Sequence, residues 1–238
     1  MQTKRFYRDW TGQSGLINFE VVIFETDLSI FCDRMLKDEA QTIVYSLRKD
    51  ISDYIDKNPS FKDSLKPLPD DADAPYIVKD MIEASRVAGV GPMAGVAGAI
   101  AEHAGIKLLN YSSEIIIENG GDIFLKSKNK KVLGVYAGSS PLSGKVRIRV
   151  DPKDAPMGIC TSSGTVGHSM SFGIADAVTI ISGSAILADC VATEACNLVK
   201  DKNDLQKSIK YAKSIDGING ILIIADDRLA TWGEIELV

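Results

Sequence analysis

The 238-residue sequence lacks any hydrophobic run close to the roughly 20 residues that span a bilayer, and its first ten residues, MQTKRFYRDW, are polar. Both absences argue against a membrane helix or a secretion signal, so we expect a soluble, cytoplasmic protein. The sequence also lacks a block of basic residues, and its net charge is −5. Because nucleic-acid phosphates are bound by clustered Lys and Arg, we expect no nucleic-acid partner. The one local group of lysines, KSKNKK at 126–131, predicts a solvated hairpin tip.

Cysteine and histidine are scarce. No CxxC pair occurs, and the four cysteines are far apart or lie in apolar runs, which predicts reduced, buried thiols instead of disulfides. They are Cys32, Cys160, Cys190 and Cys196. Of the two histidines, His103 lies among small helical residues and is assigned no role, whereas His168 lies in a loop considered below.

Apolar periodicity divides the rest of the chain, whose 45% hydrophobic residues are ample for a core. Alternation over 16–32 predicts two strands joined at ETD, and spacing of three and four predicts helices. No repeat or linker interrupts the pattern, so we predict one α+β domain, 1–238, with mixed or antiparallel sheets and packed helices. The further expected strands are 114–118, 123–126, 132–137, 145–150, 177–181, 220–225 and 230–237, and the expected helices are 40–55, 76–87, 93–109, 184–199 and 205–214.

The segment SSEIIIENGGDIF places a carboxylate, Asp122, directly after Gly120 and Gly121, between two expected strands. Glycines tolerate positive φ and let another group approach the backbone, so this turn could present Asp122 beside exposed amides to a polar ligand. The alternative is a tight hairpin turn closed by an Asx-type hydrogen bond.

The segment GICTSSGTVGHSMSFG, 158–173, runs from an apolar strand end into hydroxyls and glycines. Successive amides in such a loop can hold an anion, and the hydroxyls add donors, so phosphate is the natural guest. It matches neither a Walker loop nor a GxSxG elbow. His168 is a candidate acid, base or ligand anchor, and the alternative is a structural hydrogen bond. The phosphate candidates are Thr161, Ser162, Ser163, Gly164 and Thr165.

A third group lies in SAILADCVATEACNLV, where Asp189 and Thr193 are four residues apart and share one helix face. A carboxylate and a hydroxyl are oxygen ligands of the kind that Mg²⁺ accepts. The alternative is a buried Thr bonded to the preceding turn and an Asp near the positive end of the helix. Asp176, before the strand AVTII, is a weaker candidate that more simply ends a turn.

The order of these pieces resembles that of the ApbE-type flavin transferases. The chain looks closest to an uncharacterised prokaryotic family that shares their fold, and this likeness extends from about Glu25 to the C-terminus. The segments that carry it are GVGPMAGVAGAIAEHAG, IIIENGGDIFL, GVYAGSSPLSGK and GICTSSGTVGHSMSFGIADAVTIISGSAILADCVAT. The match to the catalytic transferases themselves is partial and covers mainly 91–197.

The resemblance implies binding of FAD with Mg²⁺, and in the transferases FMN is then joined to a hydroxyl of an acceptor protein. It places the metal ligands at Asp189, Thr193 and the carbonyl of Ala97, and it places Asp122 at the aspartate after paired glycines. Mg²⁺ would neutralise charge developing on the pyrophosphate of a flavin nucleotide or other nucleotide ligand.

Two departures from the transferases favour a second hypothesis. The transferases have a lysine in an alanine-lysine-glycine-tyrosine run where this chain has Gly98, and the His, Asp-Pro and Thr-Gly segment after the hydroxyl loop is missing. The chain could therefore be a non-catalytic binding or assembly protein that retains the fold and has lost the transfer reaction. The acceptor protein and the oligomeric state, a homo-oligomer included, stay open.

Overall fold

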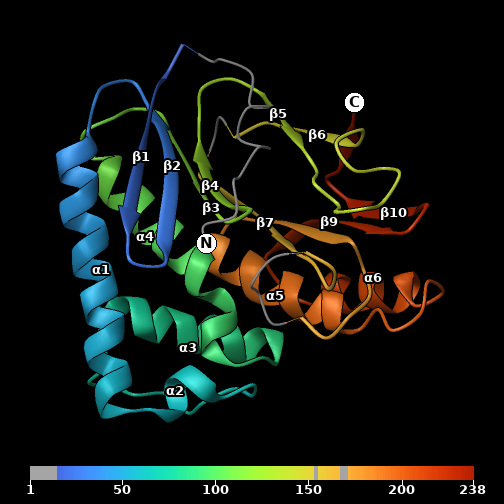
Figure 1. The fold of residues 1–238 in the computed structure, drawn as a ribbon, viewed down its shortest axis with the longest axis horizontal. Helices are drawn as coiled ribbons and strands as arrows, with labels where there is room; N and C mark the ends of the chain where they lie inside the picture. The colour runs from blue at the N-terminus through green and yellow to red at the C-terminus, as the bar shows by residue number, and fades with distance from the viewer. Residues whose placement is uncertain (1–14, 153–154, 167–170) are drawn as a thin grey trace.

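The computed structural model describes residues 15–152, 155–166 and 171–238. Two antiparallel sheets and a layer of helices form one α+β fold. The large sheet has eight strands in the order β1-β2-β3-β4-β7-β8-β9-β10, and the small sheet has three in the order β11-β6-β5. Figure 1 shows β5 and β6 above the large sheet, with α5 and α6 beneath it. The sequence predicted mixed or antiparallel sheets, and the described strands pair in the antiparallel direction.

The large sheet begins with the hairpin of β1 (Ile17–Ile23) and β2 (Thr26–Cys32). Ile23 pairs with Thr26, so the predicted turn is a two-residue one, with Phe24 at φ 53°. The sheet continues through β3 (Ile115–Asn119), β4 (Asp122–Lys126), β7 (Met157–Ser162), β8 (Ala177–Ser182), β9 (Ile218–Ala225) and β10 (Arg228–Gly233).

The helices cover one face of this sheet. They are α1 (Lys37–Lys57), α2 (Ser60–Asp63), α3 (Tyr76–Ala88), α4 (Val96–Leu108), α5 (Ala185–Asn197) and α6 (Leu205–Lys213), and the 3₁₀ turn η2 (Pro92–Gly95) precedes α4. Helical spacing of Ala40, Val44, Leu47 and Ile51 buries one side of α1. Gly89, at φ 77°, ends α3 in the left-handed conformation that glycine adopts without strain.

The small sheet contains β5 (Lys131–Gly134), β6 (Arg147–Val150) and β11 (Glu236–Leu237), and it packs on the other face of the large sheet. Ile148 and Val150 from β6 meet Leu125, Ile159 and Leu222 of the large sheet there. The prediction of a hairpin tip at 126–131 was wrong, because β4 and β5 belong to different sheets and this segment connects them.

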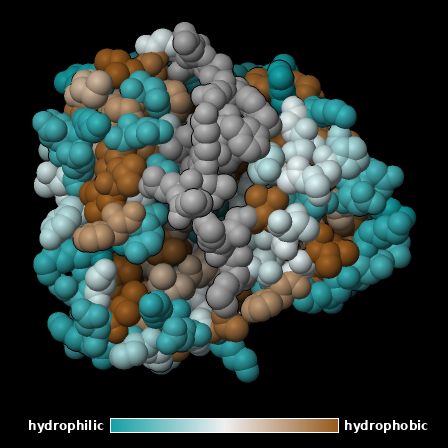
Figure 2. Space-filling view, viewed as in Figure 1, coloured by the Kyte–Doolittle hydropathy of each residue, from teal (hydrophilic) through white to brown (hydrophobic). Residues whose placement is uncertain are grey.

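All four cysteines are buried and free, which confirms the prediction of reduced thiols. Among the described helices, none is both long enough and apolar enough to cross a membrane. On the face shown in Figure 2, hydrophobic side chains lie in small groups between polar ones.

Candidate functional site

The predicted tight turn after β3 is a Gly-Gly hairpin. Asn119 pairs with Asp122, and the intervening Gly120 and Gly121 have φ values of 72° and 108°. The Gly121 amide donates to the Glu118 carboxylate at 2.8 Å. Residues with a Cβ rarely adopt such positive φ values. The paired glycines therefore allow a tight turn, and β4 begins immediately at Asp122.

The Asp122 side chain is buried on the helix-covered face of the sheet. It shares this face with Phe124, whose ring occupies the space beside Gly105 of α4. The Asp122 carboxylate accepts a hydrogen bond of 3.2 Å from the Thr161 amide of β7. The turn after β3 and the start of the predicted phosphate loop are therefore in direct contact.

Asp189, on α5, is buried against the beginning of α4. Its carboxylate accepts a hydrogen bond of 2.9 Å from the Gly98 amide. A Cβ on Gly98 would lie 2.4 Å from the Ala185 carbonyl oxygen and 2.9 Å from the Asp189 Cβ, so only glycine lets the two helices approach this closely. The small residues of 93–109 thus form a close-packing surface here.

Asp122 and Asp189 affect each other electrostatically, although 67 positions separate them in the sequence. Burial raises the pKa of Asp122 well above its usual 3.8, and the negative charges of Asp189 and then Glu118 raise it further against the Thr161 hydrogen bond. Burial likewise raises the pKa of Asp189 to about 7, although the Gly98 and Ala97 amides act to lower it. Two nearby acids in a site with little water favour binding of a proton or a cation.

Two further oxygen atoms belong to this neighbourhood. Thr193 is buried one helical turn after Asp189, and its hydroxyl makes no hydrogen bond within the described parts of the chain, so the expected bond to the preceding turn is absent. The Ala97 carbonyl accepts a hydrogen bond of 3.0 Å from the Asn119 side chain. Ala97 is therefore close to the β3–β4 turn.

The hydroxyls of the predicted phosphate loop do not all face this neighbourhood. Thr161 and Ser162 belong to β7, and because they are adjacent in a strand, their side chains point to opposite faces. The Thr161 hydroxyl bonds that of Thr179 at 2.8 Å. Ser162 lies on the face of Cys160, which bonds the Ala185 carbonyl of α5, and the buried Ser162 hydroxyl has no partner among the described residues.

The rest of the loop is bonded internally. The Ser163 hydroxyl accepts hydrogen bonds from the amides of Thr165 and Val166, and the Gly164 amide donates to the Ala175 carbonyl. The Thr165 hydroxyl donates to Asp176, which also accepts from the Asp226 amide. These three amides are thus occupied, and the expected run of free amides is absent from 164–166. Asp176 directly precedes β8.

His168 lies outside the described residues. Within the parts of the chain that are described, no group of three or more His, Cys, Asp or Glu side chains forms a metal-binding cluster. A cation at the Asp189 site would therefore depend on hydroxyl, carbonyl or ligand oxygens as well as carboxylates.

Sequence reasoning missed Asn119 and Glu102. The sequence ENGGD indicates Asn119 only as a turn residue. The Glu102 carboxylate of α4 accepts hydrogen bonds from the Ser184 hydroxyl at 2.9 Å and from the Ile186 amide at 3.0 Å, so it stabilises the start of α5. A glutamate on a small-residue helix carries no local signal of a partner 82 positions away.

The family described as AbpE bacteria matches residues 8–217. The chain belongs to this family. A UPF0280 protein of Methanocaldococcus jannaschii is 41% identical over 225 residues, which cover 92% of this chain and 91% of the relative. A UPF0280 protein of Methanospirillum hungatei is 42% identical, with 89% and 85% covered. The predicted relationship to ApbE is thereby confirmed.

Solved structures of flavin transferases share the fold. The flavin transferase ApbE of Vibrio cholerae superimposes with a TM-score of 0.61, 12% identity, and coverage of 92% of this chain and 97% of that one. The apo flavinyl transferase ApbE of Pseudomonas stutzeri gives 0.59 and 13%, with 92% and 94% covered. At this identity the likeness establishes the fold and leaves the activity to the residues of the site.

Proposed function

We propose that this protein binds a flavin nucleotide, FAD or FMN, or another nucleotide pyrophosphate, together with Mg²⁺, between the start of α4, the β3–β4 turn and α5. The observation that carries the proposal is the proximity of Asp122 and Asp189, two buried carboxylates that form no ion pair with a described Lys, Arg or His side chain. Two buried carboxylates repel each other and lose their hydration, so a proton or a cation usually offsets this cost. Such pairs occur mainly at functional sites.

The residues present fit Mg²⁺. Asp189 and Thr193 offer a carboxylate and an unbonded hydroxyl from one helix face, and Ala97 offers a carbonyl from α4. Hard oxygen atoms of this kind suit Mg²⁺, which usually retains waters or takes phosphate oxygens as its remaining ligands. When bound, Mg²⁺ would neutralise charge on a pyrophosphate.

The protein's own groups have distinct roles in this proposal. Asp122 holds the Thr161 amide and supplies the second negative charge of the site. Ser162 brings a buried hydroxyl that has no other described partner and can donate to a phosphate oxygen. Ser163, Gly164 and Thr165 shape the wall of the site through their internal bonds, and Gly120 and Gly121 leave room beside it. His168 remains the candidate acid or base.

An FMN-transferase-like reaction on an acceptor protein is the catalytic form of this proposal. A non-catalytic binding or assembly protein is the second candidate, and specific contacts favour it. Asp189 is already bonded to the Gly98 amide, and the Ala97 carbonyl already accepts a hydrogen bond from Asn119. The site is thus closed by internal hydrogen bonds where the transferases, by the resemblance, have a lysine.

Calorimetric titration of the purified protein with Mg²⁺ and ADP or FAD tests the proposal. Because coupling between two ligands is reciprocal, each should tighten binding of the other. Asp189→Asn should remove the coupling, while the exposed Asp216→Asn should leave it unchanged. Equal nucleotide affinity with and without Mg²⁺ in the wild type would refute the metal site. Mass spectrometry of an acceptor protein incubated with FAD would separate the catalytic form from the binding form.

A further inference from the structure

The outer face of the small sheet carries a row of basic side chains. The segment KVRIRV, 145–150, alternates basic and apolar residues. Ile148 and Val150 are buried between the two sheets, so Arg147 and Arg149 of β6 share the opposite, outward face. The exposed Lys145 precedes the strand and lines the same hollow. This face lies across the large sheet from Asp122 and Asp189, and it is therefore separate from the candidate nucleotide site.

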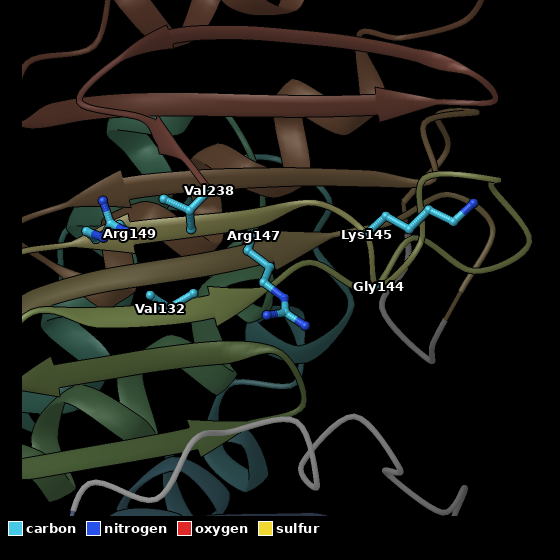
Figure 3. A pocket seen from close by; sticks show the side chains of 6 residues that line it. All are labelled: Val132, Gly144, Lys145, Arg147, Arg149 and Val238. Carbon is cyan, nitrogen blue, oxygen red and sulfur yellow. The ribbon is translucent and has the colours of Figure 1, made fainter.

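The basic row borders an open hollow of about 610 Å³. Figure 3 shows Arg147 reaching toward the end of the strand that carries Val132, with Lys145 farther along its own segment. Such an open surface cannot enclose most of a small ligand, and it suits an extended segment of a larger partner better. The hollow is lined by Val132, Gly144, Lys145, Arg147, Arg149 and Val238.

The charges in this hollow are unequally compensated. Arg149 is paired with Glu236, its neighbour on β11. Arg147 has Gly134 beside it on β5, and its carbonyl accepts the Val238 amide on the other side, so neither neighbouring side chain offers a carboxylate. Lys145 and Arg147 form no ion pair with any described residue. Among the described residues, no carboxylate thus neutralises these two charges by an ion pair, on a protein whose net charge is −5.

One edge of β5 has no partner among the described strands, and it lies next to these charges. Of the described strands, β5 pairs only with β6, which leaves one row of its backbone groups without a strand partner. An added strand would lie about 4.8 Å beyond β5. Because Gly134 has no side chain, a carboxylate on that added strand could approach Arg147 across the end of β5.

We propose that this face binds an acidic, extended segment of a partner protein, which adds a strand to the edge of β5. Main-chain hydrogen bonds to β5 would supply affinity, and contacts of acidic side chains with Arg147 and Lys145 would select the partner. Val132 and Val238 would contact apolar atoms of the same segment. The proposal does not depend on nucleotide binding.

A fluorescently labelled, acetylated peptide of alternating glutamate and threonine tests it by anisotropy with the full chain. Binding should be saturable and should weaken as salt is raised. Arg147→Glu should lower affinity about tenfold, because a charge-assisted contact is replaced by repulsion. Lys207→Glu, an equal charge change at an exposed position of α6, should leave the affinity unchanged. Gly134→Val should weaken binding by obstructing the approach to Arg147, and its backbone is not in the positive-φ region.

Circular dichroism and melting curves must show that each variant is folded, and Lys145→Gln replaces Arg147→Glu if the latter is not. Absence of saturable binding overturns the proposal. So does an equal loss of affinity in Lys207→Glu, which would mean attraction by overall charge alone. Full binding in Gly134→Val would overturn strand addition at β5, and complete competition by inorganic phosphate would indicate a simple anion site.

Discussion

The Asp189 carboxylate of α5 stabilises the start of α4 by accepting a hydrogen bond of 2.9 Å from the Gly98 amide. The relationship is reciprocal, because Glu102 of α4 accepts hydrogen bonds from Ser184 and Ile186 at the start of α5. The first amides of a helix have no partner within it, so each helix satisfies amides of the other. This exchange fixes the antiparallel packing of α4 and α5 and holds Asp189 near Asp122.

Glu102→Ala should destabilise the protein by about 1 to 2 kcal/mol, the usual cost of losing a helix cap. Chemical denaturation gives the free energy of unfolding directly. Glu83→Ala, an exposed site on neighbouring α3, is the matched control and should change stability by less than about 0.5 kcal/mol. Equal effects of the two substitutions would show that the contacts of Glu102 with α5 contribute little.

Gly98→Ala should destabilise the protein by roughly 1 to 3 kcal/mol or more, because the new methyl group would overlap the Ala185 carbonyl. Gly183→Ala, just before α5, serves as the control, since a Cβ there meets nothing within 4 Å. The denaturation midpoints of the two variants should therefore differ clearly. A freely tolerated Gly98→Ala would mean that α4 and α5 can separate at no cost.

Stability without metal should fall as pH rises from about 4 to 7. Asp189 has a pKa of about 7 in the folded protein and 3.8 ordinarily, so the folded state binds the proton more tightly over this interval. The stabilisation is complete below about pH 4 and is lost as Asp189 ionises. The raised pKa of Asp122 acts in the same direction.

Between pH 5 and 8, the free energy of unfolding should change by roughly 1 to 3 kcal/mol less in Asp189→Asn than in the wild type. The substitution removes the ionising group and nearly preserves its shape. Urea denaturation in the presence of a chelator measures the effect, with exposed Asp216→Asn as the control. If the variant has the same pH profile as the wild type, the pKa of Asp189 is not raised in the folded protein.

The fold was predictable where local chemistry decided it. Apolar spacing predicted α1 and α3, and the paired glycines predicted the hairpin before Asp122. The hydroxyl-rich end of β7 was interpreted as a loop, because Thr and Ser suit both turns and strands, and only pairing with β8 distinguishes the two. The opposite orientations of Thr161 and Ser162 follow from that strand, so the loop prediction could not show which hydroxyl faces Asp122.

The family resemblance assigned a role to Asp122 and to Asp189, whereas the contacts that bring their segments together were not predictable. Glu102 with Ser184 and Asn119 with Ala97 join segments that are distant in sequence. Neither pair has a spacing or a motif that identifies its partner. Such contacts depend on the packing of α4 against α5 and the sheet, which single-sequence patterns do not specify.

Ser162→Ala should raise the stability of the ligand-free protein by up to about 1 kcal/mol. The Ser162 hydroxyl is buried without a described partner, so its removal takes away an uncompensated desolvation cost. Ser182→Ala, on adjacent β8, should instead destabilise the protein, because the Ser182 hydroxyl donates to the Gly217 carbonyl at 2.8 Å. Melting temperatures of the two variants should thus move in different directions.

If Ser162 serves the proposed nucleotide, the same Ser162→Ala variant should bind ADP with Mg²⁺ about fivefold to tenfold more weakly, the loss expected for one hydrogen bond to a charged group. A destabilised Ser162→Ala protein with unchanged nucleotide affinity would assign this hydroxyl to the fold and remove it from the site.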